Sequence, residues 1–136
     1  MKKIISLLSV FCMLFCLVSC NASLGTSISS KYPQNKKIIE VEAEEYGDSA
    51  YFVTKRELKN VSVNRMLYDN KTQGYSLEET IYTKDSLSSD ECLRIVVDLQ
   101  VQPYIAVKFT LNDKTYEQYL YRNPESGKML LLELQK

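Results

Sequence analysis

Residues 93–101 read Leu-Arg-Ile-Val-Val-Asp-Leu-Gln-Val, and this stretch decides the fold class. Every second side chain is apolar, and polar side chains occupy most of the positions between them. A period of two is typical of a β-strand with one buried face, and the β-branched run Ile95-Val96-Val97 favours the same conformation. We therefore predict a strand, whose apolar face consists of Leu93, Ile95, Val97, Leu99 and Val101.

A helix is the competing interpretation of this region. Ser88 and Glu91 have the spacing of a helix capping box, and Leu93 with Val96 would fit a helical stripe. Five alternating positions outweigh one short motif, so the strand is preferred. Pro103 then ends the strand or marks a bulge, because proline cannot donate a hydrogen bond to a neighbouring strand.

The same alternation recurs on both sides of this stretch. Residues 105–111 and 116–121 flank Asn112-Asp113, which predicts a β-hairpin with a two-residue turn. In that register Phe109 faces Tyr116, and Lys108 faces Glu117 as an opposite-charge pair. Three further runs are expected to present an apolar face: Ile39, Val41 and Ala43; Tyr75, Leu77 and Ile81; and Leu130, Leu132 and Leu134.

Turn residues separate these runs at short intervals, as in antiparallel β proteins. We count about seven strands and no clear helix. The expected fold is all-β, either a small antiparallel β-sandwich or a partly closed barrel.

The amino terminus has the pattern of an export signal. Lys2 and Lys3 precede a run from Ile4 to Val18 that is apolar apart from two serines. The run is roughly 15 residues long, short of the roughly 20 that a membrane-spanning helix needs. We therefore predict a signal peptide over residues 1–19.

Residues 17–20, Leu-Val-Ser-Cys, resemble the lipobox of bacterial lipoproteins. The resemblance covers only the first 20 residues of the chain. It implies that the Cys20 thiol receives a diacylglyceryl group, that cleavage before Cys20 makes it the first mature residue, and that its new amine is acylated, for example with palmitate. Two or more acyl chains hold a protein stably on a membrane.

Three segments follow from these features. Residues 1–19 form the lipoprotein signal peptide, and residues 20–37 form the lipidated cysteine and a flexible tether rich in Ser, Asn, Lys and Gly. Residues 38–136 form a single β domain.

The chain contains no histidine, and this absence excludes more kinds of catalytic site than any other feature of the composition. It excludes Ser-His-Asp and Cys-His catalysis and nearly all catalytic zinc sites. The row Glu40, Glu42 and Glu44 lies on one strand face, whereas acid/base catalysis or cation binding needs groups that converge from several elements. We expect a solvated strand face, no enzyme activity, no cofactor and no metal.

The net charge indicates which partners to expect, and the cysteine content indicates whether disulfides can stabilise the domain. Removal of Lys2 and Lys3 leaves 15 basic against 17 acidic residues, a net charge of −2, so no nucleic acid is expected as a partner. Only Cys20 and Cys92 survive maturation, and the lipid occupies Cys20. No intramolecular disulfide can form, and Cys92 is expected to be a buried, inert thiol.

Tyrosine is the remaining distinctive feature, with ten in the chain and no tryptophan. The hairpin register places Tyr104, Tyr119 and Tyr121 together on the outer side of the sheet. These three are the candidate binding face, since exposed tyrosines suit recognition. The alternative is that a second layer covers them and they belong to the core.

Two functions are favoured by these observations, and a third, a carboxylate-based hydrolase, would need two acidic groups that face each other across a cleft. The first is a non-catalytic binding or assembly component of the cell envelope, lipid-anchored on the outer membrane and facing the periplasm by default. In overall architecture alone, such a chain looks like the outer-membrane lipoproteins of type VI secretion apparatuses, which contain a transthyretin-like sandwich. The second is an inhibitor of a cell-wall hydrolase, because some lysozyme inhibitors are lipid-anchored small β-barrels, although their usual cysteine pairing cannot form here.

Overall fold

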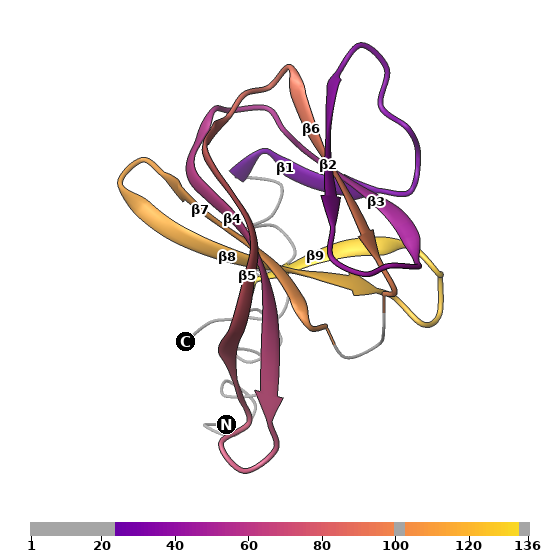
Figure 1. The fold of residues 1–136 in the computed structure, drawn as a ribbon, viewed down its shortest axis with the longest axis vertical. Helices are drawn as coiled ribbons and strands as arrows, with labels where there is room; N and C mark the ends of the chain where they lie inside the picture. Colours follow the sequence, from indigo (N-terminus) through magenta and orange to yellow (C-terminus); the bar gives the residue numbers. More distant parts are fainter. Residues whose placement is uncertain (1–23, 100–102, 134–136) are drawn as a thin grey trace, which may run out of the picture.

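A computed structural model describes residues 24–99 and 103–133. Within these ranges the chain forms two β-sheets that pack face to face (Figure 1). One sheet has the order β1-β3-β6-β2 and the other the order β5-β4-β7-β8-β9. The strands are β1 (Thr26–Ser29), β2 (Lys37–Glu42), β3 (Asp48–Thr54), β4 (Leu58–Asp69), β5 (Gly74–Leu87), β6 (Glu91–Val97), β7 (Ile105–Leu111), β8 (Lys114–Arg122) and β9 (Met129–Glu133).

The two sheets share one apolar core, because alternate side chains of each strand point toward the other sheet. Phe52 of β3 and Phe109 of β7 meet across the sandwich with ring centroids 6.4 Å apart. The predicted all-β class is confirmed, and the form is an open sandwich of two sheets with nine strands in the described residues instead of about seven.

The strand that decided the fold class lies in the middle of the four-stranded sheet as β6. Leu93, Ile95 and Val97 are fully buried, as their alternation predicts. The two residues form one of the two capping-box hydrogen bonds, and they do so in a turn: the Ser88 N–H donates to Glu91 Oε1 at 2.9 Å. The Glu91 N–H donates to the Ser88 carbonyl at 3.1 Å instead of to the Ser88 hydroxyl. The chain then continues as a strand, so these residues form the turn that precedes β6 and do not start a helix.

One pairing departs from the antiparallel expectation. β2 runs parallel to β6, while β3 pairs with β6 in the antiparallel sense on its other side. Parallel neighbours need a long crossover, and here β3, β4 and β5 supply it. Glu40 and Arg94 lie opposite each other in the parallel register and form an ion pair at 2.6 Å.

The hairpin between β7 and β8 has the predicted register over the pairs that the structure shows. Phe109 lies opposite Tyr116, and Lys108 lies opposite Glu117. Asn112 and Asp113 both have positive φ, 52° and 64°, which is the conformation of a type I′ two-residue turn.

The expectation that Tyr75, Leu77 and Ile81 share an apolar face is wrong. The register between β4 and β5 shifts twice, and each shift leaves one extra residue in β5. Ile81 is the extra residue at one shift and packs against the core, whereas Leu77 faces away from it and is 60% exposed. Counting every second residue along the sequence cannot show where a strand carries an extra residue and its side chains switch faces.

The buried face of the last strand is also the opposite of the one expected. Met129 and Leu131 of β9 point into the core, because Leu131 lies opposite the buried Leu120 of β8. Leu130 therefore faces outward, and Leu132 belongs to a second apolar cluster on that outer side. Leu134 lies outside the described residues.

The tether expected over residues 20–37 conflicts with the structure from residue 24 onward. Leu24 is buried in the core, and β1 pairs with β3 in the antiparallel sense. The Thr26 hydroxyl donates to Gln118 Oε1 of β8 across the sandwich at 2.8 Å, and both side chains are buried. The polar composition of this segment therefore conceals an edge strand.

A close backbone contact holds the loop between β2 and β3 to the end of β6. A Cβ atom at Gly47 would lie 2.5 Å from the Val97 carbonyl carbon, and the other near atoms also belong to backbone. Gly47→Ala must therefore displace the loop or the strand, and we expect it to lower the free energy of unfolding by about 2–3 kcal/mol. Urea unfolding checks this, with Gly74→Ala as the control, because a Cβ there meets only ordinary contacts. Equal midpoints for the two variants would contradict the close packing.

Candidate binding face

The outer side of the five-stranded sheet carries a cluster of aromatic and aliphatic side chains. β8 contributes Tyr119 and Tyr121, which lie opposite Leu132 and Leu130 of β9. Alternate residues of a strand share one face, so these four side chains project to the same side. With three residues of the hairpin between β4 and β5, they form the set that we call the tyrosine face: Tyr68, Tyr75, Leu77, Tyr119, Tyr121, Leu130 and Leu132.

Ring contacts join tyrosines of this face to one another. The Tyr68 and Tyr75 rings lie opposite each other next to the hairpin turn, with centroids 5.0 Å apart. Tyr75 in turn packs on Tyr119 at 4.7 Å. Such aromatic pairs contribute about 0.5–1.5 kcal/mol each beyond the area that they bury. The long hairpin is therefore joined to β8 by side chains as well as by the sheet.

Tyr119 is only 2% exposed, so it forms the buried base of the tyrosine face and not its accessible surface. Its hydroxyl donates to Glu117, and burial together with that carboxylate raises the pKa of the Tyr119 phenol. Leu77 and Leu130, 60% and 43% exposed, offer the accessible apolar surface, and Tyr121 is half-buried beside Leu130.

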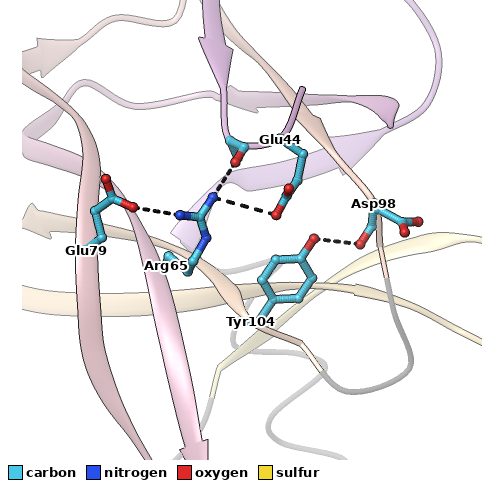
Figure 2. Close-up of polar contacts among 6 residues, drawn as sticks. Glu44, Arg65, Glu79, Asp98 and Tyr104 are labelled. Carbon is cyan, nitrogen blue, oxygen red and sulfur yellow. Dashed lines mark hydrogen bonds and ion pairs between the residues drawn. The ribbon is translucent and has the colours of Figure 1, made fainter. Parts of the chain in front are cut away.

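The structure does not bring Tyr104 together with the other two predicted tyrosines. β7 begins only at Ile105, and the Tyr104 ring packs against the main core between the sheets. Its hydroxyl donates to the Asp98 carbonyl at 2.9 Å, and burial raises the pKa of the phenol to about 12 (Figure 2). Pro103 interrupts the alternation just before this residue, so the hairpin pattern could not be extended to it.

A polar cluster beside Tyr104 joins the two sheets. The Arg65 guanidinium of β4 binds Glu79 of β5 at 2.6 Å and Glu44, which follows β2, at 3.6 Å (Figure 2). It also donates to the Ala43 carbonyl. One cation thus neutralises two carboxylates that come from different sheets, and the arrangement acts as a clamp between layers. Nothing in the sequence indicated Arg65, because its partners are brought together only by the fold.

The acidic row of β2 is divided between ion pairs and solvent. Glu40 is held by Arg94, Glu44 by Arg65, and Glu42 is exposed. Over residues 24–99 and 103–133, no group of three or more His, Cys, Asp or Glu side chains is arranged to hold a metal ion.

Two isolated ionisable groups lie inside the fold. Cys92 is free and fully buried, and burial raises the pKa of its thiol to about 11, so the reactive thiolate is scarce at neutral pH. The Glu133 side chain has one buried oxygen with no hydrogen-bond partner among residues 24–99 and 103–133, and burial raises the pKa of this carboxyl. Neither group has the convergent neighbours that nucleophilic or acid/base catalysis needs.

The predicted signal peptide, the lipobox-like sequence and Cys20 lie outside the described residues. In the part of the chain that the structure covers, no helix is long and apolar enough to cross a membrane. Comparison with family models, curated proteins and solved structures finds no match.

Proposed function

We propose that this chain is a bacterial lipoprotein, anchored through Cys20 and extracytoplasmic, that acts as a non-catalytic binding or assembly component of the cell envelope. A secretion apparatus in the outer membrane, with the domain facing the periplasm, is its most concrete setting. The observation that carries the proposal is the Leu-Val-Ser-Cys sequence at residues 17–20, which ends four residues before the core residue Leu24.

The tyrosine face supports a binding role. Tyrosines are rigid, offer a large apolar area and carry a hydroxyl for hydrogen bonding, and they are enriched among residues that dominate binding energy. Leu77 and Leu130 leave apolar area exposed on the same face. Isolated exposed leucines are ordinary, but these two lie on the same side of the sheet as the packed aromatic rings, and exposed apolar groups beside tyrosines favour an interaction surface.

The test compares two variants in cells treated with a crosslinker. Leu77→Ser/Tyr121→Ser/Leu130→Ser removes accessible groups of the tyrosine face and leaves its buried support, Tyr119, in place. The control, Tyr46→Ser/Leu67→Ser, removes exposed apolar groups elsewhere, because Tyr46 lies in the loop after β2 and Leu67 is on the other side of β4.

We expect both variants to fold and to remain membrane-bound, and only the first to lose its crosslinked envelope proteins, identified by mass spectrometry. Retention of the same partners by both variants would reject the tyrosine face as the binding surface. Tight binding of the purified domain to lysozyme would instead favour an inhibitor of cell-wall hydrolases.

A further inference from the structure

The link between the lipid site and the folded domain is short. Leu24 is a core residue and β1 begins at Thr26, so only residues 21–23 lie between Cys20 and the core. Four Cα-to-Cα steps span at most about 14 Å even when fully extended. A domain held this closely cannot rotate freely above a bilayer, so one of its ends must lie against the membrane.

The contacts of Gly25 identify that end. The Lys55 N–H donates to the Gly25 carbonyl at 2.9 Å, and Thr26 lies opposite Thr54. The turn between β3 and β4 is therefore the element beside the lipid link. Two other turns lie at this end: the one between β5 and β6, which carries the exposed Asp90, because Leu58 at the start of β4 lies opposite Leu87, and the one between β7 and β8, because Lys59 lies opposite Thr110.

This β3–β4 turn is basic and exposed. Lys55 and Arg56 are both exposed, and neither side chain forms an ion pair with any residue in the described ranges. Glu57 is paired with Lys59 at 3.1 Å, so one acidic group of the turn is already neutralised. Two free cations next to a membrane anchor match the phosphate groups of anionic phospholipids.

The opposite end of the molecule is the tip of the hairpin between β4 and β5. β4 runs from Leu58, next to the basic turn, to Asp69 at the tip, and Figure 1 shows this hairpin projecting beyond the rest of the sandwich. Twelve residues of strand extend over roughly 36 Å. Tyr68 and Tyr75 flank the turn at this far end.

We propose that the lipidated domain sits on the bilayer with Lys55 and Arg56 against anionic phospholipid headgroups, and that the β4–β5 tip points away from the membrane toward a partner. This orientation rests on the proposed lipid on Cys20. The acyl chains supply the attachment, and the two cations fix which way the domain stands.

The test measures how close each end lies to the headgroups. Mature acylated protein is placed in phosphatidylcholine vesicles with and without phosphatidylglycerol, and the lipids carry a headgroup nitroxide, which quenches only nearby dyes. A dye is attached at Glu57→Cys in one preparation and at Thr72→Cys, in the hairpin turn, in the other. The buried Cys92 does not compete for the dye.

We expect strong quenching at position 57 and almost none at position 72. On vesicles with phosphatidylglycerol, Lys55→Glu/Arg56→Glu should reduce the quenching at position 57, whereas the control Lys71→Glu in the hairpin turn should leave it unchanged. On vesicles of phosphatidylcholine alone, the charge reversal should have little effect.

The outcomes separate the two proposals. Acylated protein that is quenched equally at both positions, or more strongly at position 72, overturns the orientation and leaves the anchor intact. An unchanged signal after the charge reversal overturns the role of Lys55 and Arg56. Protein whose Cys20 carries no acyl group refutes the proposed function, and the orientation falls with it.

Discussion

Val97→Asp is expected to unfold the domain. The side chain is fully buried in the core of the sandwich, and the Gly47 backbone is packed against the same residue, so a carboxylate there can reach neither water nor a cation without opening the structure. Burial of an unpaired charge costs several kcal/mol, a large part of the roughly 5–15 kcal/mol that stabilises a typical domain. Circular dichroism during heating should show no cooperative transition, or one at a much lower temperature.

Leu67→Asp provides the control, because it introduces the same charge on a strand at a position that is 56% exposed. Its cost should stay within about 1 kcal/mol. If the two variants melted at the same temperature, the inward orientation of Val97, and with it the assignment of the β6 face, would be wrong.

The buried face of β6 and the register of the β7–β8 hairpin could be predicted from sequence, because local patterns determine both. Where one side of a strand is buried and the other is solvated, as at Leu93, Ile95 and Val97, alternation records the orientation directly. The hairpin register could also be predicted, because Asn112-Asp113 fixes the loop length and the Lys108–Glu117 pair checks it.

Other parts depend on interactions that no local pattern contains. The two register shifts in β5 are accommodated by pairing with β4, and they turn Ile81 toward the core and leave Leu77 outside. The parallel pairing of β2 with β6 joins residues that are far apart in the sequence, such as Glu40 and Arg94 at a separation of 54. β1 is too short and too polar to show a period, although Leu24 and Thr26 are buried.

The tyrosine face was predictable only in part. The register placed Tyr119 and Tyr121 on the outer side, but it could not show that Tyr75 from the distant hairpin would pack on Tyr119. Tyr68 and Tyr75 do flank the turn over residues 70–73 symmetrically, and this symmetry is the signal that could have paired them. The Arg65 clamp joins three separate segments of the chain, so only the tertiary structure reveals it.

Cys20→Ser is the second change with a large expected effect. The hydroxyl of serine cannot replace the thiol that receives the diacylglyceryl group in lipoproteins, so neither lipidation nor cleavage before residue 20 should occur. We expect the variant to lose acyl label completely and to leave the detergent phase in a partitioning assay. Cys12→Ser, in the segment that we propose is removed on maturation, is the matched control and should keep both properties. Incorporation of acyl label into Cys20→Ser would rule out this residue as the lipid site.

The mass of the amino-terminal peptide of the mature wild-type protein shows directly whether Cys20 is the first residue and carries the lipid. Membranes from the producing cells are extracted with detergent, the protein is digested, and the first peptide is fragmented in a mass spectrometer. We expect a peptide that begins at Cys20 and carries a diacylglyceryl group on its sulfur. A peptide that begins at another residue, or one whose Cys20 thiol is unmodified, would contradict this expectation.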